Sequence, residues 1–278
     1  MATIHPSARI AAGADIADDV DIGPNCTIGG EVIIARGCRL FDNVNVAGRT
    51  SVGRDTVIGA FASLGTSPQS TAPSDPTGRL TVGASCRLEG RITVNVGSSG
   101  GGGVTQIGDR CWMMANSHVG HDCLLGSDIV LGVGSALAGH CLIGDFAAFE
   151  DFSAAHQFSQ IGGSVRVDIR TFVRSDIIPF GVASGDISYL NGLNHAGMRA
   201  RNFAENDIRI ADTMYRDLFF GPDVFSARVD QAATRYAGHA LAGQIVDFIR
   251  AARQRSLCHP LPPATYGSAD GVAMSVAE

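Results

Sequence analysis

The sequence predicts an all-β parallel β-helix followed by a small α-helical domain, and a repeating pattern carries the first part of this prediction. An aliphatic residue recurs every six positions without a slip, at Ile4, Ile10, Ile16, Ile22, Ile28, Ile34, Leu40, Val46, Val52, Ile58 and Leu64. A helix repeats at about 3.6 residues and a strand at about 2, whereas a period of six is typical of a parallel β-helix built from hexapeptide repeats. If three repeats make one coil, each residue lies beside the residue three repeats later, at the strand spacing of about 4.8 Å.

The same period returns between Ile107 and Val173, where the fifth place of the repeat, counted from the apolar residue as the first, is mostly small. Six of the seven cysteines occupy that fifth place, namely Cys26, Cys38, Cys86, Cys111, Cys123 and Cys141. A cysteine in such a position acts as a small buried apolar residue. The cysteines are therefore predicted to fill the core rather than to form disulfides or bind metal.

Two interruptions of the repeat predict loops that leave the coil, near residues 66–80 and 97–104. The first contains three prolines, which cannot donate to a strand ladder. The second is a glycine run without the lysine and hydroxyl residue of a phosphate-binding loop. We therefore expect residues 1–190 to form the β-helix around these two loops.

From about Ala204 the apolar period becomes helical, which predicts a C-terminal helical domain over residues 191–256. Residues 257–278 contain three prolines and small polar residues, and a disordered tail is predicted there.

Composition narrows the classes of function. The net charge of −6 argues against a general nucleic-acid-binding protein. No apolar run approaches about 18 residues, so no membrane span is predicted. The N-terminal residues resemble no secretion signal, and the cytoplasm is the expected location. A stack of flat coils exposes three long faces, and a homotrimer would bury one of them.

The spacing of the histidines predicts a catalytic cluster. His121 lies one coil below Gly139, and Asp122 lies one coil below His140, with His118 in a neighbouring column. A histidine titrates near neutral pH, and an adjacent carboxylate can fix its tautomer, so the cluster favours general-base chemistry on an exposed edge. A glycine amide one coil away could stabilise an oxyanion. No serine or cysteine is spaced as an activated nucleophile, which favours direct transfer without a covalent intermediate.

Three motifs in these rows resemble those of a known family. They are the segments 117–123 (SHVGHDC), 137–140 (LAGH) and 155–158 (AHQF), joined by the phrase GLN at 192–194. They are similar to the motifs of the acyl-carrier-protein-dependent UDP-N-acetylglucosamine O-acyltransferases of lipid A biosynthesis, over about residues 4–255. The resemblance implies a left-handed parallel β-helix that assembles as a homotrimer, with active sites between subunits. It also implies transfer of a fatty 3-hydroxyacyl group from acyl carrier protein to a nucleotide sugar, without a cofactor or a metal.

The resemblance implies a role for each matching residue. His121 is expected to be the general base, Asp122 its orienting carboxylate, and Gly139 the donor of the oxyanion-binding amide. The residues expected to line the substrate cleft are His118, His140, His156, Gln157, Asn194, Arg201 and Gln69. Ile169 matches the position that measures the acyl chain in the family, and its branched side chain predicts a preference for chains of about ten carbons or fewer.

The sequence departs from the family pattern where the acceptor sugar is held. The family's acidic residue and lysine are replaced by the uncharged segment 68–72 (PQSTA), and its histidine-arginine-glycine is replaced by 95–97 (NVG). One of two arginines near the end of the cleft is Ala200. These changes predict an altered grip on the acceptor, and they leave open the sugar, oxygen or nitrogen acylation, the chain length and the choice between carrier-protein and coenzyme A donors.

Two other functions fit a histidine-bearing β-helix. A zinc hydro-lyase of the gamma carbonic anhydrase type would use three neutral histidines and a water molecule on zinc. A scaffold without catalytic activity could be built on the same coil. A metal assay separates the hydro-lyase from the acyltransferase.

Overall fold

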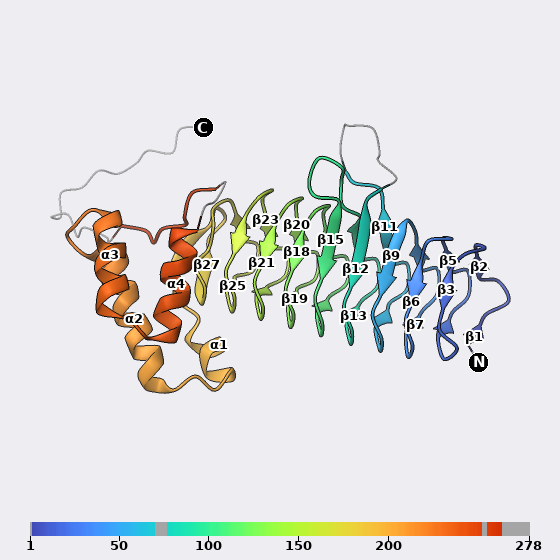
Figure 1. Ribbon diagram of the computed structural model, residues 1–278, viewed down its shortest axis with the longest axis horizontal. Coiled ribbons are helices and arrows are strands. Elements are labelled where there is room, and N and C mark those ends of the chain that lie inside the picture. The colour runs from blue at the N-terminus through green and yellow to red at the C-terminus, as the bar shows by residue number, and fades with distance from the viewer. Residues whose placement is uncertain (1, 70–76, 252–254, 263–278) are drawn as a thin grey trace, which may run out of the picture.

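The computed structural model describes residues 2–69, 77–251 and 255–262, and within them a three-sided coil of short strands carries a group of helices at its C-terminal end (Figure 1). The chain passes through three faces in every coil, here called face A, face B and face C, and neighbouring strands on a face are parallel except for the last pair on face A. Face A consists of β1 (Thr3–Ile4), β4 (Asp21–Ile22), β7 (Arg39–Leu40), β10 (Val57–Ile58), β13 (Arg87–Leu88), β16 (Trp112–Met113), β19 (Val130–Leu131), β22 (Ala148–Phe149), β25 (Arg166–Val167), β27 (Gly181–Ser184) and β28 (Tyr189–Leu193). Face B consists of β2 (Arg9–Ile10), β5 (Thr27–Ile28), β8 (Asn45–Val46), β11 (Ser63–Thr66), β14 (Thr93–Asn95), β17 (His118–Val119), β20 (Ala136–Leu137), β23 (Ala154–Ala155) and β26 (Phe172–Val173). Face C consists of β3 (Asp15–Ile16), β6 (Ile33–Ile34), β9 (Arg49–Val52), β12 (Arg79–Val82), β15 (Val104–Ile107), β18 (Leu124–Leu125), β21 (Leu142–Ile143) and β24 (Gln160–Ile161).

The strand register matches the prediction that each residue lies beside the residue three repeats later, which we call the column rule. Thr3 pairs with Asp21, and His118 pairs with Ala136, so partners on a face are three repeats apart. The corners between faces use the fourth place of each repeat, where Asp122 has a φ of 59° and His140 a φ of 63°. This left-handed backbone region is one that most side chains avoid. Its repetition at the corners turns the chain from one face to the next.

The core is the column of inward-facing residues along the coil axis. The first-place residues such as Ile22 and Ile28 are buried, as are the fifth-place cysteines. The Cys123 thiol donates to the carbonyl of Ala138 at 3.1 Å, which satisfies its only polar group inside the core. The core prediction for the cysteines is confirmed.

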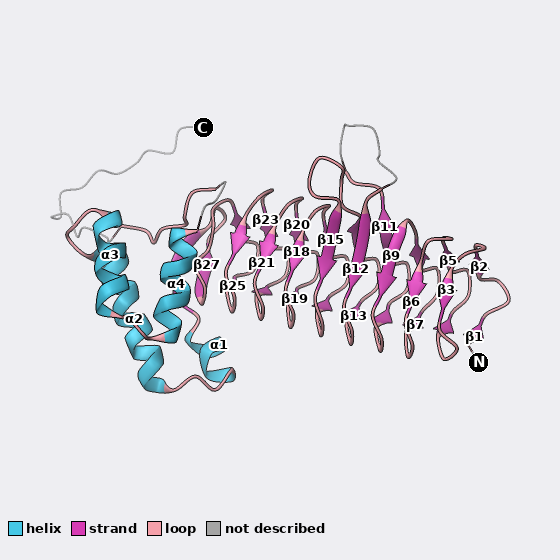
Figure 2. Cartoon of the chain, in the orientation of Figure 1, coloured by secondary structure: helices cyan, strands magenta, loops and turns pink. Residues whose placement is uncertain are grey.

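Both interruptions of the repeat leave the coil at one place, the corner between faces B and C (Figure 2). The first joins β11 to β12, and of its residues 70–76 lie outside the described range. The second joins β14 to β15 through residues 96–103, which we call the glycine loop. The side-chain amide of Asn95 donates to the carbonyl of Ser67 at 2.8 Å and so connects the bases of the two loops.

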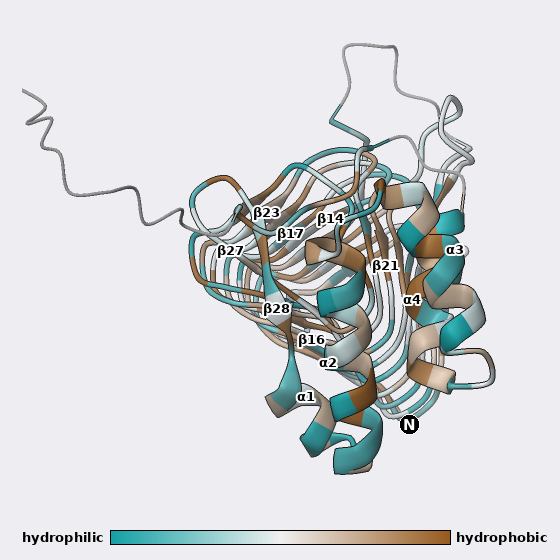
Figure 3. Cartoon of the chain, turned by 90° about the vertical axis from the view of Figure 1, so that its left-hand side faces the viewer, coloured by the Kyte–Doolittle hydropathy of each residue, from teal (hydrophilic) through white to brown (hydrophobic). Residues whose placement is uncertain are grey.

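The helical domain contains α1 (His195–Ala200), α2 (Glu205–Phe220), α3 (Phe225–Arg235) and α4 (Ala240–Arg250). Seen from the helical end, the coils are stacked behind these helices (Figure 3). The sequence pattern misses α1, because a helix of six residues shows no clear period. Asn194 begins α1, and its side chain accepts a hydrogen bond from the amide of Gly197 at 2.9 Å. No helix in the described ranges is long and apolar enough to cross a bilayer.

The chain after α4 returns to the coil, and the expectation of disorder from residue 257 is wrong for residues 257–259. The amide of Asp176 donates to the Ser256 carbonyl at 2.8 Å, and the amide of Cys258 donates to the Asp176 carbonyl at 2.8 Å. Leu190 in β28 donates to the carbonyl of His259 at 2.9 Å. We call residues 255–259 the C-terminal strap. Backbone pairing fixes this segment, and composition gives no sign of it. Of the rest of the expected tail, residues 263–278 lie outside the described residues.

Candidate functional site

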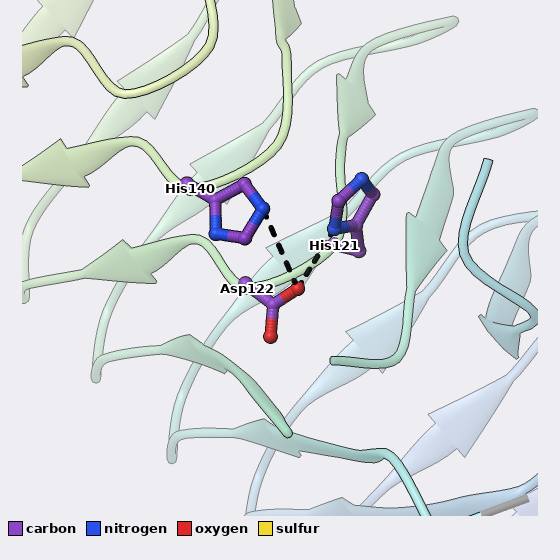
Figure 4. A group of neighbouring side chains, drawn as sticks. All are labelled: His121, Asp122 and His140. Atoms are coloured by element: carbon purple, nitrogen blue, oxygen red, sulfur yellow. Dashed lines mark hydrogen bonds and ion pairs between the residues drawn. The ribbon is translucent and has the colours of Figure 1, made fainter. Parts of the chain in front are cut away.

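His121, Asp122 and His140 meet at the corner between faces B and C, as the column rule predicts (Figure 4). Nδ1 of His121 lies 2.7 Å from Oδ2 of Asp122, and Nε2 of His140 lies 3.9 Å from the same oxygen. The two imidazole rings meet edge to face at 4.9 Å between centroids. The expectation of an exposed edge is wrong for His121, which is only 7% exposed because Gly139 packs against its ring.

The glycine loop holds the Asp122 carboxylate. The amide of Ser98 donates to both carboxylate oxygens at 3.0 Å, and the Ser98 hydroxyl donates to Oδ2 at 2.6 Å. The amide of Gly103 donates to Oδ1 at 3.2 Å, and the amide of Asp122 itself donates to the Thr105 hydroxyl at 2.8 Å. A glycine-rich cradle of this kind binds anions, and here the anion is a side chain of the same protein.

These hydrogen bonds favour the ionised form of the Asp122 carboxyl. Burial raises the pKa of the Asp122 carboxyl, but the hydrogen bonds from Ser98 and His121 outweigh it, so that this pKa lies below its ordinary value. An ionised carboxylate only accepts, so Nδ1 of His121 must be the donor in the 2.7 Å contact. In the neutral ring, Nε2 of His121 then carries a free lone pair, which is the form that a general base requires.

Gly139 lies directly against this basic nitrogen. A Cβ atom at Gly139 would lie 2.8 Å from Nε2 of His121, closer than side-chain carbons approach other atoms. Within the described ranges, the backbone amide of Gly139 donates to no acceptor, although the amides on either side of it do. The site therefore places a free amide donor beside a free basic nitrogen. That pair can take a proton from one group and stabilise a negative oxygen on another.

His118 and His140 lie on either side of His121, and the pKa of each ring is lowered. Nδ1 of His118 lies 2.7 Å from the hydroxyl of Thr93, and the ring of His140 stacks on Phe158 at 4.4 Å between centroids. Burial lowers the pKa of His118, with a further lowering by nearby His121. Burial also lowers the pKa of His140, against the opposing charge of Asp122.

These shifts predict acid sensitivity of the fold. A histidine whose pKa is lower in the folded state takes up its proton first in the unfolded state, so stability is lost as pH falls below the ordinary histidine value of about 6.5. His118→Gln should reduce the fall of the thermal midpoint between about pH 7 and pH 5. The exposed His5 is the control, and His5→Gln should leave that fall unchanged. An unchanged fall in His118→Gln would contradict the prediction.

His156 and Gln157 occupy the same corner one coil beyond His140, and both are half-buried. Nε of Arg255, in the C-terminal strap, donates to the Gln157 carbonyl at 2.8 Å. The same guanidinium contacts Nδ1 of His156. The ring of His156 lies 6.0 Å from that of Phe172.

The other expected site residues lie at different corners of the coil. Asn194 donates to the Ser164 carbonyl at 3.0 Å, and the Arg201 guanidinium lies 3.9 Å from the ring centroid of Phe146, both at the corner between faces C and A. Ile169 lies at the corner between faces A and B and is 55% exposed. Gln69 is exposed beside the segment 70–76, and the substituted loop residues Ser70 to Ala72 fall outside the described residues.

The sequence interpretation missed Ser98, Gly103 and Arg255. The column rule offers a signal for the loop residues. Val104 directly follows the glycine run and stands three repeats before Asp122, so the rule places the end of that run beside Asp122. Nothing in the repeat pattern marks Arg255, which reaches the corner from beyond the last helix.

This chain is similar to known proteins over most of its length. The family model described as "Udp N-acetylglucosamine O-acyltransferase; Domain 2" matches residues 176–258. The acyl-[acyl-carrier-protein]–UDP-N-acetylglucosamine O-acyltransferase of Azorhizobium caulinodans is 41% identical over 260 residues, 94% of this chain and 96% of that protein. The Caulobacter vibrioides protein of the same name is 38% identical over 93% of this chain and 98% of its own length.

Solved structures of UDP-N-acetylglucosamine acyltransferases are also similar to this chain. The UDP-N-acetylglucosamine O-acyltransferase of Moraxella catarrhalis superposes with a TM-score of 0.89 at 30% identity, over 92% of this chain and 99% of that one. The Francisella novicida UDP-N-acetylglucosamine acyltransferase superposes with a TM-score of 0.90 at 26% identity, over 93% and 95%. The predicted left-handed parallel β-helix with a C-terminal helical domain is confirmed.

Proposed function

The chain belongs to the family of acyl-carrier-protein-dependent UDP-N-acetylglucosamine O-acyltransferases, and we propose that His121 is the general base of its reaction. The predicted acyltransferase activity is confirmed by this membership, and no comparison favours the hydro-lyase or the inactive scaffold. The observation that carries the proposal is the hydrogen-bonded Asp122 carboxylate. It accepts from Nδ1 of His121 and leaves Nε2 unprotonated.

The proposed reaction is a direct transfer. Nε2 of His121 takes the proton of the acceptor hydroxyl while the oxygen attacks the carbonyl carbon of the acyl thioester. The negative charge that forms on the carbonyl oxygen is held by the amide of Gly139. The carbon–sulfur bond then breaks, and the imidazolium returns its proton to the leaving thiolate of the carrier protein. Asp122 stabilises the imidazolium between these two proton transfers.

We propose that the working site is completed in a homotrimer. Asn194 and Arg201 lie at one corner of the coil and His121 at another, so one chain does not bring the expected substrate-binding residues together. A second copy could place its own Asn194 and Arg201 opposite His121. The acyl donor would be acyl carrier protein and the acceptor a UDP-N-acetylglucosamine-like nucleotide sugar, with the cytoplasm as the location predicted from the sequence.

The donor set of the cluster argues for a base rather than for zinc. His121, Asp122 and His140 offer ligand atoms within 4.8 Å of one another, but both oxygens of Asp122 already accept hydrogen bonds from the glycine loop. His118, a third ligand in the hydro-lyase alternative, instead contacts Thr93.

We therefore expect purified protein to transfer an acyl group from acyl carrier protein to UDP-N-acetylglucosamine at the same rate before and after treatment with a chelator. Mass spectrometry of the sugar product and elemental analysis for zinc check this expectation. Stoichiometric zinc together with activity that is lost on chelation would overturn the assignment of the base.

Ile169 is expected to limit the length of the acyl chain. Its exposed branched side chain occupies space that terminal methylenes would need, and each buried methylene contributes about 0.8 kcal/mol. Ile169→Gly should shift the preferred donor from about ten carbons or fewer to longer chains, with each added carbon favoured up to roughly fourfold. Turnover measured across carrier-protein donors of increasing length tests this. An unchanged preference would remove Ile169 from this role and leave it as a packing residue.

A further inference from the structure

The C-terminal strap brings the side chain of Arg255 to the corner between faces B and C, where His121 also lies. Backbone hydrogen bonds between Asp176 and both Ser256 and Cys258 fix the strap on the coil that follows His156. Cys258 is 3% exposed, so the strap is a packed part of the fold. Arg255 is the strap residue that faces the corner, and its side chain contacts two groups there.

We propose that Arg255 is a positioning residue that fixes the tautomer of His156. The guanidinium only donates hydrogen bonds, so its contact with Nδ1 of His156 requires that nitrogen to be an acceptor. The single proton of the neutral ring must then be on Nε2. His156 can therefore offer only a donor to whatever lies beyond its outer nitrogen.

A second contact of the same guanidinium disfavours the competing tautomer. Nδ1 of His156 lies 3.4 Å from the carbonyl oxygen of Gln157, which would attract a proton on Nδ1. Nε of Arg255 donates to that carbonyl at 2.8 Å. The planar guanidinium thus competes for the alternative acceptor with one N–H group and donates to Nδ1 of His156 with another. Two fixed N–H groups achieve this together, which a lysine ammonium on a flexible chain does less well.

The consequence for catalysis rests on the proposed function. A fixed Nε2–H donor at His156 suits an acceptor group of the acyl donor, such as an amide carbonyl of the carrier's thiol arm. With the other tautomer, Nε2 would present a lone pair to that carbonyl and repel it. Arg255 is accordingly expected to act on donor binding through His156, without contacting the reacting atoms.

The direct test reads the two ring nitrogens of His156 by NMR on the full-length protein with nitrogen-15-labelled histidine. The His156 signals are identified by their loss in His156→Gln. We expect the Nε2–H form in the wild type, and in Arg255→Ala we expect the Nδ1–H form to become the major one as the Gln157 carbonyl becomes available. An Nδ1–H form in the wild type, or an unchanged form in Arg255→Ala, would overturn the proposal. These signals report the tautomer whether or not the protein transfers acyl groups, so failure of the proposed function is seen separately.

Kinetics supply the second measurement. Arg255→Ala should lower kcat/KM for the acyl donor about tenfold, the factor that one ordinary hydrogen bond supplies. The effect should be mainly on KM. Arg255→Lys should recover part of this loss, whereas full recovery would assign the effect to charge alone and overturn the two-point contact.

The control is Arg250→Ala, because Arg250 pairs with Asp230 at 2.6 Å on the outside of the helical domain. Arg250→Ala should change neither the tautomer nor kcat/KM. An equal loss of kcat/KM in both alanine variants would show that the effect is not specific to Arg255 and would overturn the assignment.

Discussion

His121→Asn should lower kcat by about two to four powers of ten, because general-base catalysis by a positioned side chain supplies a factor of that size. Asparagine is chosen because its amide can still donate to Asp122. Oδ2 of Asp122 lies 2.7 Å from Nδ1 of His121, and the loss of one hydrogen bond to a charged group costs about 1.5–3 kcal/mol. Thermal unfolding of His121→Asn should therefore stay close to that of the wild type. His121→Ala should lose the same activity and also some stability.

The measurement is acyl transfer under single-turnover conditions beside a thermal melt of each variant. His5→Asn removes an exposed imidazole from the first coil and should leave both quantities unchanged. Turnover within a few-fold of the wild type in a folded His121→Asn protein would mean that another group accepts the proton. His118 and His140 would then be the residues to replace next.

The coil could be predicted from the sequence because its inward positions repeat. An apolar residue at the first place recurs along the coil, the fifth place is mostly small, and strands of two to five residues offer no other period. The meeting of His121, Asp122 and His140 follows from the same arithmetic, since partners on a face are three repeats apart. Both are local consequences of a regular stack.

Features that depend on departures from the repeat could not be predicted in the same way. The burial of His121 arises from Gly139 in the next coil, and the glycine loop that holds Asp122 follows a path that no period describes. The pairing of the C-terminal strap depends on backbone hydrogen bonds at Asp176, which leave no trace in composition. The corner at which Ile169 lies follows from the column rule, but the position of Asn194, which lies beyond the repeats, does not.

The glycine loop should be sensitive to a single methyl group at one glycine and tolerant of it at the next. A Cβ at Gly101 would lie 2.4 Å from the Asp122 carboxylate and 2.4 Å from the His140 ring, whereas a Cβ at Gly100 would meet no atom within 4 Å. Neither residue has the left-handed φ that restricts Gly102 and Gly103. Gly101→Ala and Gly100→Ala therefore make the same chemical change in the same loop, and only the first collides with the cluster.

In Gly101→Ala the loop must lift away from Asp122 and weaken the hydrogen bonds from Ser98 and Gly103. A hydrogen bond to a charged group contributes about 1.5–3 kcal/mol, so the loss of one lowers kcat by roughly ten- to a hundredfold. The acid side of the pH profile of kcat/KM should also move to higher pH, because the pKa of Asp122 would rise toward its ordinary value without these donors. Gly100→Ala should keep the wild-type rate and pH profile. Equal losses in both variants would assign the effect to general stiffening of the loop, and a normal rate in Gly101→Ala would show that His121 keeps its tautomer without the glycine loop.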